Sequence, residues 1–172
     1  MKTAQFKRVA QQYKDFIYSY AYYFTGTRED AEDLTQEMLL KIWENMDSLR
    51  LGLTKSWVTK VTRNLCIDWL RRRGARPETP PPLDSGERDP DLPAPFVESD
   101  VETEELRRNI KKAIAKLPEK SRSVIILREI EDLKYEEISE VLDMPINSVK
   151  SYIHRGRRLL RQHLSAIYEN DY

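Results

Sequence analysis

The prolines of this 172-residue chain are distributed very unevenly, and this limits what the chain can fold into. Seven of its nine prolines lie within residues 74–100. Proline lacks a backbone N–H and its ring blocks the interior of a helix, so this stretch cannot be helical. The remaining sequence contains only Pro118 and Pro145. The chain is therefore expected to fold as two parts, residues 1–73 and 101–172, joined by an extended or disordered tether.

Charge is balanced over the whole chain but not locally. The chain carries 29 Lys and Arg side chains and 29 Asp and Glu side chains. The tether is acidic, with 7 acids against 2 bases, whereas residues 150–164 hold five Lys and Arg and no acid. A zero net charge does not argue against nucleic-acid binding, because such binding depends on where the cations lie.

Apolar side chains in the first part recur every three or four residues, which indicates amphipathic helices. A helix is predicted over residues 3–24, ended by Gly26. Its apolar positions are Phe6, Val9, Tyr13, Phe16, Ile17, Tyr20 and Phe24. Thr27 is a good N-cap for a second helix, in which the early Asp and Glu side chains suit the helix dipole. The buried face of this second helix is predicted to comprise Ala31, Leu34, Met38, Ile42 and Met46.

A third helix, rich in both cations and aromatic rings, is predicted after a break at residues 47–55. It begins near Ser56 and ends in three arginines before Gly74, where cations suit a helix C-terminus. Its apolar positions recur at four-residue spacing: Trp57, Val61, Leu65 and Trp69. Aromatic rings among cations suit unpaired bases and backbone phosphates. The alternative, favoured for Trp57, is that both tryptophans are core residues.

Helices are predicted throughout the second part as well. The first of them is stopped by Pro118. Its apolar positions are Leu106, Ile110, Ala113, Ile114 and Leu117. The next spans about 119–130, with Val124 and Leu127 inward. Because no strand signal of any strength occurs along the chain, the predicted fold class is all-α.

A helix-turn-helix is predicted over residues 135–154, because small or apolar side chains fall where two helices must cross. The predicted core positions are Ile138, Ser139, Leu142, Met144, Val149 and Ile153. Asp143 tolerates the left-handed backbone that such a turn needs. Asn147 is expected to cap the second helix, which runs to about Ser165.

The face of this second helix opposite its apolar side is polar and basic. It carries Ser148, Lys150, Ser151, His154, Arg155 and Arg158. These donors are of the kind that reach phosphates and base edges in a major groove. The alternative is a plain helical hairpin with a solvated basic face, which is what runs of charge usually mean.

Other classes of site are not indicated. A single cysteine, Cys66, excludes an internal disulfide and a cysteine-based zinc site, and it is expected to be a buried side chain. His154 and His163 lie in a basic helix and not in a ligand cluster. We expect no metal, no cofactor and no enzymatic activity, since no Gly-rich phosphate loop or catalytic set is present. The sequence has no signal peptide and no run long enough to span a membrane, so the expected location is the cytoplasm.

Three segments, taken together, resemble the signature segments of the extracytoplasmic-function (ECF) sigma factors of bacterial RNA polymerase. They read DAEDLTQEMLLKIW, SWVTKVTRNLCIDWLRRR and KLPEKSRSVIILREIEDLKYEEISEVLDMPINSVKSYIHRGRRLLRQHL. The resemblance covers nearly all of residues 1–73 and 105–165. Three segments in the right order around a proline-rich spacer are far more specific than any one of them.

The resemblance implies two small helical domains with separate tasks. The first, residues 1–73, would bind the clamp helices of core RNA polymerase and recognise and melt the minus-ten promoter element. The second, residues 101–172, would bind the minus-thirty-five element as a duplex and the polymerase flap. The linker 74–100 would thread toward the RNA exit path. An anti-sigma factor is a further expected partner.

The same resemblance assigns individual residues. The polymerase-facing residues would be Asp30, Asp33, Gln36 and Glu37. The melted strand would lie along Lys60, Arg63, Asn64, Arg71, Arg72 and Arg73. The minus-thirty-five duplex would be read by Lys150, Ser151, His154 and Arg155. Residues 47–55 would pocket a flipped base, but they follow no family pattern closely, so no base preference is predicted.

Two other classes of protein stay open. A simple helix-turn-helix regulator with an effector-binding first domain would explain residues 119–165, but it does not explain the cation-rich aromatic helix at 56–73. A helical adaptor without a nucleic-acid role is the second alternative. Polymerase binding would separate a sigma factor from the regulator, and salt-dependent DNA affinity would separate both from the adaptor.

Overall fold

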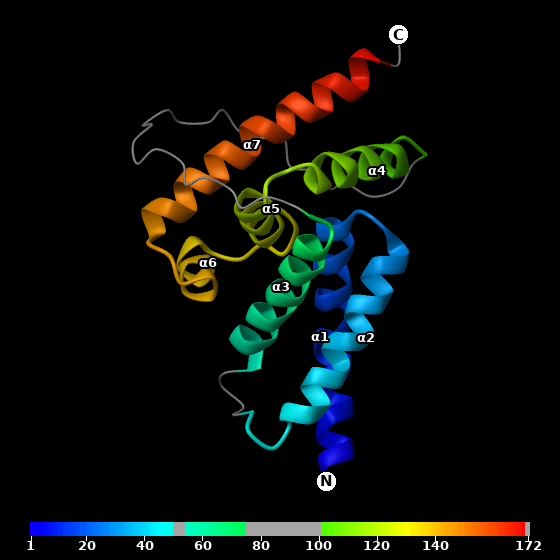
Figure 1. The fold of residues 1–172 in the computed structure, drawn as a ribbon, viewed down its shortest axis with the longest axis vertical. Coiled ribbons are helices and arrows are strands. Elements are labelled where there is room, and N and C mark those ends of the chain that lie inside the picture. The colour runs from blue at the N-terminus through cyan, green and yellow to red at the C-terminus, as the bar shows by residue number, and fades with distance from the viewer. Residues whose placement is uncertain (50–53, 75–100, 171–172) are drawn as a thin grey trace. The chain divides into compact units, whose positions relative to one another are not determined.

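The computed structural model describes residues 1–49, 54–74 and 101–170, without the side chains of 101–103. The chain divides into two compact units, residues 1–76 and 77–172. The first unit holds α1 (Lys2–Thr25), α2 (Arg28–Asn45) and α3 (Thr54–Arg72) (Figure 1). The second holds α4 (Val101–Ala115), α5 (Glu119–Ile125), the π-helical turn η1 (Ile126–Ile130), α6 (Tyr135–Leu142) and α7 (Ile146–Glu169).

Every element in the described part of the chain is helical, so the predicted all-α class is confirmed. Apart from Gly74, the predicted tether 74–100 lies outside the described residues. None of the helices in the described part is both long and apolar enough to cross a membrane.

The junction of α1 and α2 follows the predicted turn chemistry. Gly26 adopts φ 80°, and its N–H donates to the carbonyl of Tyr22, which closes α1. The Thr27 hydroxyl accepts a hydrogen bond from the Asp30 N–H at 3.3 Å and caps α2. The two helices pack on each other, and the predicted inner face of α2 is buried throughout. It comprises Ala31, Leu34, Met38, Ile42 and Met46.

Helix α3 packs on α1 and α2, but through a different face from the predicted one. Its buried residues are Thr54, Val58, Thr59, Thr62, Leu65, Cys66 and Ile67. Trp57, Val61 and Trp69 are only half-buried, so the predicted apolar stripe is wrong except at Leu65. The buried Val58, Thr62 and Cys66 each follow a predicted position by one residue, so the buried face lies about 100° around the helix from the predicted stripe. Cys66 is buried, as expected.

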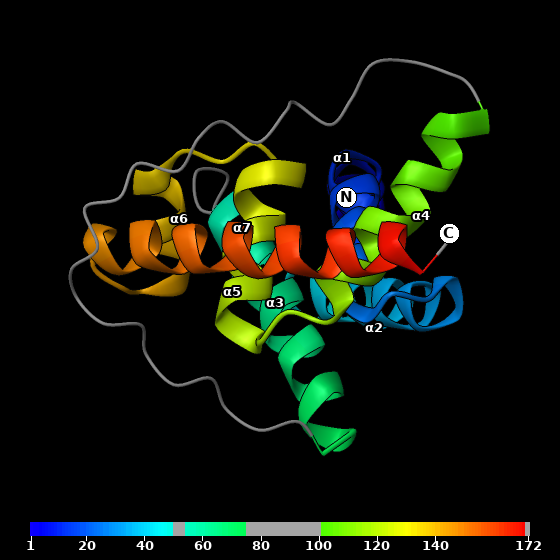
Figure 2. The ribbon, with the colours of Figure 1, turned by 90° about the horizontal axis from the view of Figure 1, so that it is seen from above.

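The core of the second unit lies where α5 runs into η1. Val124, Ile125, Ile126 and Leu127 have no exposed surface. Helix α7 packs against α4, α5 and α6 (Figure 2). It packs tightly on α5 at Gly156, where an added Cβ would lie 2.5 Å from Cγ1 of Ile125. Only glycine fits this crossing.

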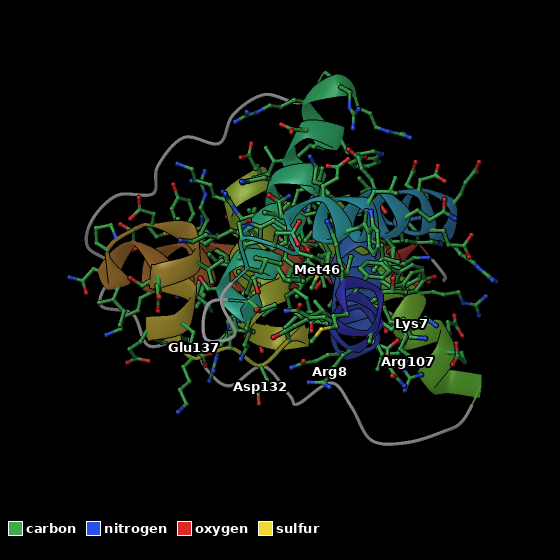
Figure 3. All side chains as sticks on the ribbon, turned by 90° about the horizontal axis from the view of Figure 1, so that it is seen from below. Lys7, Arg8, Met46, Arg107, Asp132 and Glu137 are labelled. Atoms are coloured by element: carbon green, nitrogen blue, oxygen red, sulfur yellow. The ribbon has the colours of Figure 1, made fainter. Side chains whose placement is uncertain are left out.

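The helix predicted over 119–130 does not keep one geometry. It becomes a π turn in which the Glu131 N–H donates to the Ile126 carbonyl at 3.0 Å. The turn is followed by Asp132, an exposed residue at φ 54° (Figure 3). Periodicity does not reveal this change, because one wider turn leaves Val124 and Leu127 inward as predicted.

The helix-turn-helix is present, and its turn has the expected left-handed residue, Asp143, at φ 50°. The Ser139 hydroxyl donates to the Met144 carbonyl at 2.6 Å and fixes the turn. The predicted cap, Asn147, is wrong. Helix α7 begins at Ile146, and the Pro145 carbonyl accepts from the N–H groups of Ser148 and Val149. Proline's fixed φ favours the start of a helix, and this puts Asn147 inside the first turn.

Candidate nucleic-acid interface

The polar face of α7 is assembled as the sequence predicted. Val149, Ile153, Gly156 and Leu160 are buried, and the six candidate residues lie on the other side of the helix. Lys150 and Arg158 are exposed; the half-buried members are Ser148, Ser151, His154 and Arg155. The hydroxyl of Ser151 donates to the Asn147 carbonyl at 3.0 Å, and its oxygen keeps the capacity to accept.

One of the five cations within residues 150–164 is not part of that polar face. Arg157 turns toward η1, where its Nε donates to Oε1 of Glu129 at 2.7 Å. Both side chains are mostly covered, at 22% and 20% exposure. Arg157 is not among the six side chains predicted to face DNA, but the sequence did not show that its partner is Glu129.

Helix α3 carries the second group of candidates. Lys60, Asn64, Arg71 and Arg72 are exposed. Arg63 is half-buried, and its Nε has no hydrogen-bond partner among the described residues. Half-buried Trp57 and Trp69 lie on the same helix, so rings and cations are both within reach of a ligand there.

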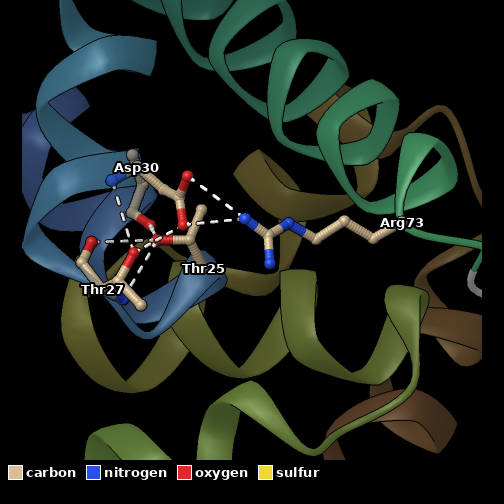
Figure 4. A network of polar contacts seen from close by, with 5 residues as sticks. Thr25, Thr27, Asp30 and Arg73 are labelled. Atoms are coloured by element: carbon tan, nitrogen blue, oxygen red, sulfur yellow. Dashed lines mark hydrogen bonds and ion pairs between the residues drawn. The ribbon is translucent and has the colours of Figure 1, made fainter.

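Arg73 and Asp30 differ from the other candidates because they bind each other (Figure 4). One guanidinium nitrogen of Arg73 lies 3.3 Å from Oδ2 of Asp30, and the same oxygen accepts from the Thr27 hydroxyl at 2.6 Å. The guanidinium also stacks on Trp69, 4.5 Å from the ring centroid. The pair thus joins the end of α3 to the start of α2, and Asp30 is 21% exposed.

The outer surface of α2 holds the remaining acidic candidates. Asp33, Gln36 and Glu37 are exposed, and one turn further along lie two apolar side chains. Leu40 is 63% exposed and Trp43 38%. Sequence analysis missed both, although they fall outside the predicted inner face of α2, and an apolar residue outside that face is the signal that would have found them.

Two further features near these surfaces were not singled out from the sequence. Trp43 is held edge-to-face by Phe6 at 5.3 Å, and Nζ of Lys2 lies 5.1 Å from its ring centroid. Lys7 and Arg8 are exposed on α1 (Figure 3). The predicted base pocket at 47–55 falls partly outside the described residues, which omit 50–53.

The two units match two different family models. Residues 9–76 match sigma-70 region 2, and residues 107–160 match sigma-70 region 4. Among curated proteins, the ECF RNA polymerase sigma factor SigW of Bacillus subtilis is 35% identical over 169 residues, which cover 92% of this chain and 88% of SigW. SigE of Mycolicibacterium smegmatis is 34% identical over 157 residues; they cover 91% of this chain but 60% of that longer relative.

Solved structures give the same result. The sigma factor RpoE of Bartonella quintana, in complex with the anti-sigma factor NepR, superposes with a TM-score of 0.67 at 25% identity, over 93% of this chain and 96% of RpoE. CnrH, in complex with the cytosolic domain of CnrY, has a TM-score of 0.64 at 21% identity and supports the fold alone. The sequence match to SigW along almost the whole chain, together with the two region matches, means that this chain belongs to the ECF family of RNA polymerase sigma factors.

Proposed function

We propose that this sigma factor directs core RNA polymerase to promoters by dividing the work between its two units. The first unit binds the polymerase and the melted minus-ten strand, and the second reads the minus-thirty-five element as a duplex. The observation that carries this proposal is the polar face of α7, which is backed by a closely packed core at Gly156. A rigid helix with donors along one side suits an intact major groove.

The polymerase-binding surface in this proposal is the outside of α2. Exposed Asp33, Gln36 and Glu37 lie one turn before two exposed apolar side chains, Leu40 and Trp43. Interfaces commonly combine an apolar or aromatic anchor with a polar rim, in which the anchor supplies most of the binding energy. The acids steer a basic partner, and Leu40 and Trp43 hold it. Asp30, which binds Arg73, supports this surface from inside the unit.

The melted strand is assigned to α3. Its exposed Lys60, Asn64, Arg71 and Arg72 meet phosphates and base edges, with Arg63 beside them. Half-buried Trp57 offers part of its ring to an unstacked base, and such stacking contributes about 1–3 kcal/mol per base. That gain offsets part of the stacking that is lost when the promoter opens, about 1.4 kcal/mol per step.

The partners follow from this assignment. They are core RNA polymerase, promoter DNA and an anti-sigma factor, the last supported by the solved sigma factor RpoE, which is bound to the anti-sigma factor NepR. The chain acts as a binding subunit without catalysis of its own, and it works in the cytoplasm, where the polymerase is.

Run-off transcription is the direct test. Core polymerase plus the full chain should start transcripts at discrete sites on genomic DNA fragments, and core polymerase alone should not. A simple regulator would bind DNA without forming a stable complex with core polymerase, and an adaptor would do neither. Salt-dependent DNA binding without any complex with core polymerase would overturn the proposal in favour of the regulator.

A further inference from the structure

Two consecutive residues of the π turn, Arg128 and Glu129, make side-chain contacts with the two helices of the helix-turn-helix, α6 and α7. Nη1 of Arg128 donates to the Leu133 carbonyl at 3.0 Å, and its guanidinium lies 5.1 Å from the ring centroid of Tyr135, the first residue of α6. Glu129 faces the other way and accepts from Arg157 of α7. The turn therefore connects to both helices through adjacent side chains.

The ion pair with α7 lies beside a tight helix crossing in the second unit. Gly156, where an added Cβ would lie 2.5 Å from Cγ1 of Ile125, directly precedes Arg157. The lack of a side chain at Gly156 lets α7 lie close against Ile125 of α5. Rotation of α7 about its own axis is resisted one residue later by the bond from Arg157 to Glu129. Because both charged groups are about four-fifths covered, solvent and salt screen this attraction less than they screen an exposed pair.

We infer that Glu129 and Arg157 are positioning residues that set the rotation of α7, and so decide which of its side chains meet base edges. Arg157 then makes no DNA contact, although it lies inside the basic stretch. The inference rests on the proposed reading of duplex DNA by α7. It goes beyond that proposal because it attributes part of the sequence specificity to Glu129 and Arg157, which do not touch the DNA.

This role has a signature that direct DNA contact lacks. Hydrogen bonds to base edges weaken steeply when their angles change, so a rotated α7 loses discrimination between sequences. Long Lys and Arg side chains still reach phosphates after a small rotation, so overall affinity and its salt dependence persist. Loss of a phosphate contact has the opposite effect: binding falls evenly for all sequences and the salt slope becomes shallower.

The experiment uses the full chain with core polymerase. A duplex is first selected by the wild-type complex from a fully randomised library, and a shuffled version of it serves as the non-specific probe. Each variant is titrated against both duplexes at several salt concentrations. The variants are Glu129→Gln, Arg157→Gln, the reversed pair Glu129→Arg with Arg157→Glu, and two comparators. Arg158→Gln is the neighbouring cation on the DNA face, and Glu105→Gln is an exposed acid on α4.

We expect Glu129→Gln and Arg157→Gln each to lower the ratio of selected to shuffled affinity by about tenfold, the effect of one lost base contact, with an unchanged salt slope. The reversed pair should restore most of the ratio, because the pairing returns with its signs exchanged. Arg158→Gln should weaken both duplexes equally and reduce the salt slope by about 0.9. Glu105→Gln should match the wild type.

Several results would overturn the inference. An unchanged ratio in both Gln variants, a reversed pair no better than the singles, or Arg157→Gln behaving like Arg158→Gln would each do so. If a Gln variant loses helicity, Arg157→Lys replaces it: that variant keeps the charge but not the planar fork. It should lower the ratio partially at wild-type helicity, and an undiminished ratio contradicts the inference. If the wild type prefers no duplex at all, the proposed reading of DNA by α7 fails, and the inference fails with it.

Discussion

The two units place their cations among different neighbours. In the first unit, α3 carries its cations beside half-buried tryptophans, and Arg73 stacks directly on Trp69. In the second, the cations of α7 stand among serines and a histidine, while Tyr152 of the same helix is buried. Rings beside cations bind bases that have left the stack, and small polar side chains fit between the walls of an intact groove. This difference between the units is the reason for proposing that one chain handles two states of the same promoter.

The two units also differ in how exposed their interhelical ion pairs are to solvent. The side chains of Arg73 and Asp30, which join α3 to α2, are 60% and 21% exposed, whereas those of Arg157 and Glu129, which join α7 to η1, are 22% and 20% exposed. A pair with one exposed partner is screened more by solvent and adjusts more easily. The more covered pair holds its helix in a narrower range of positions. Reading a duplex demands such rigidity, and following a single strand does not.

The largest effect should come from reversing two acids on α2. We expect Asp33→Arg with Glu37→Arg to abolish assembly with core polymerase, since each reversal places a cation against a basic partner at a cost of about 2 kcal/mol or more. Co-purification with core polymerase measures assembly, and circular dichroism checks helicity. Asp15→Arg, at an exposed acid on α1, is the matched control. Normal assembly by the double variant would remove α2 from the polymerase interface.

The next effect tests whether the units fold separately. Gly156→Val forces side-chain atoms into Ile125 and should destabilise the second unit by about 1–3 kcal/mol. Trp43, Trp57 and Trp69, the only three tryptophans, all belong to the first unit, so tryptophan fluorescence, excited where tyrosine does not absorb, reports on that unit alone. Urea should therefore reduce helicity early while the fluorescence transition stays in place. A fluorescence transition shifted equally with the helicity would show that the units unfold together.

Much of this fold could be predicted from sequence because its signals are local. Caps and turns depend on a few neighbouring residues, which is why Thr27, Gly26 and Asp143 behave as expected. The inner face of α2 was found because its apolar positions advance by three and four residues. On α3 the large apolar side chains lie beside the buried face and not on it, because the helix turns Val58, Thr62 and Cys66 inward in place of the two tryptophans.

Several features that escaped prediction join residues distant in sequence. Asp30 binds Arg73 across 43 positions, and Glu129 binds Arg157 across 28. A charge pattern gives the number of cations but not their partners, so neither ion pair could be read from it. The π turn was missed because helix propensity does not distinguish it from an α turn.

A smaller effect separates Asp30 from the other acids of α2. Asp30→Asn weakens the bonds to Arg73 and to the Thr27 hydroxyl, and it should lower the stability of the first unit by about 1 kcal/mol or less. Assembly with core polymerase should be unaffected. Tryptophan fluorescence in urea gives the stability, and Asp33→Asn, at an exposed position, is the control. Loss of assembly in Asp30→Asn at wild-type stability would instead make Asp30 a direct polymerase contact.

The smallest effect concerns pH and the second unit alone. Burial, and after it the nearby charge of Lys116, lowers the pKa of His163 below its ordinary value. The unfolded chain then binds this proton more readily, so the contribution of neutral His163 to stability is complete above about pH 6.5 and declines as pH falls below it. Helicity in urea at pH 7.5 and pH 5.5 measures the change. His163→Gln should reduce the difference between the two pH values, and a difference that keeps its wild-type size in this variant would exclude His163 as the cause.

The central claim is that the units handle different states of promoter DNA. It is tested most directly by comparing one alanine variant from each unit on both states of the promoter. Arg63→Ala in α3 and Arg155→Ala in α7 are each titrated, in complex with core polymerase, against a duplex promoter and against one melted in advance across the minus-ten element. Arg155→Ala should weaken binding to the duplex by about 1–3 kcal/mol if it contacts a base through two hydrogen bonds. On the pre-melted template Arg63→Ala should be the more damaging of the two. Equal losses for both variants on both templates would contradict the division of labour.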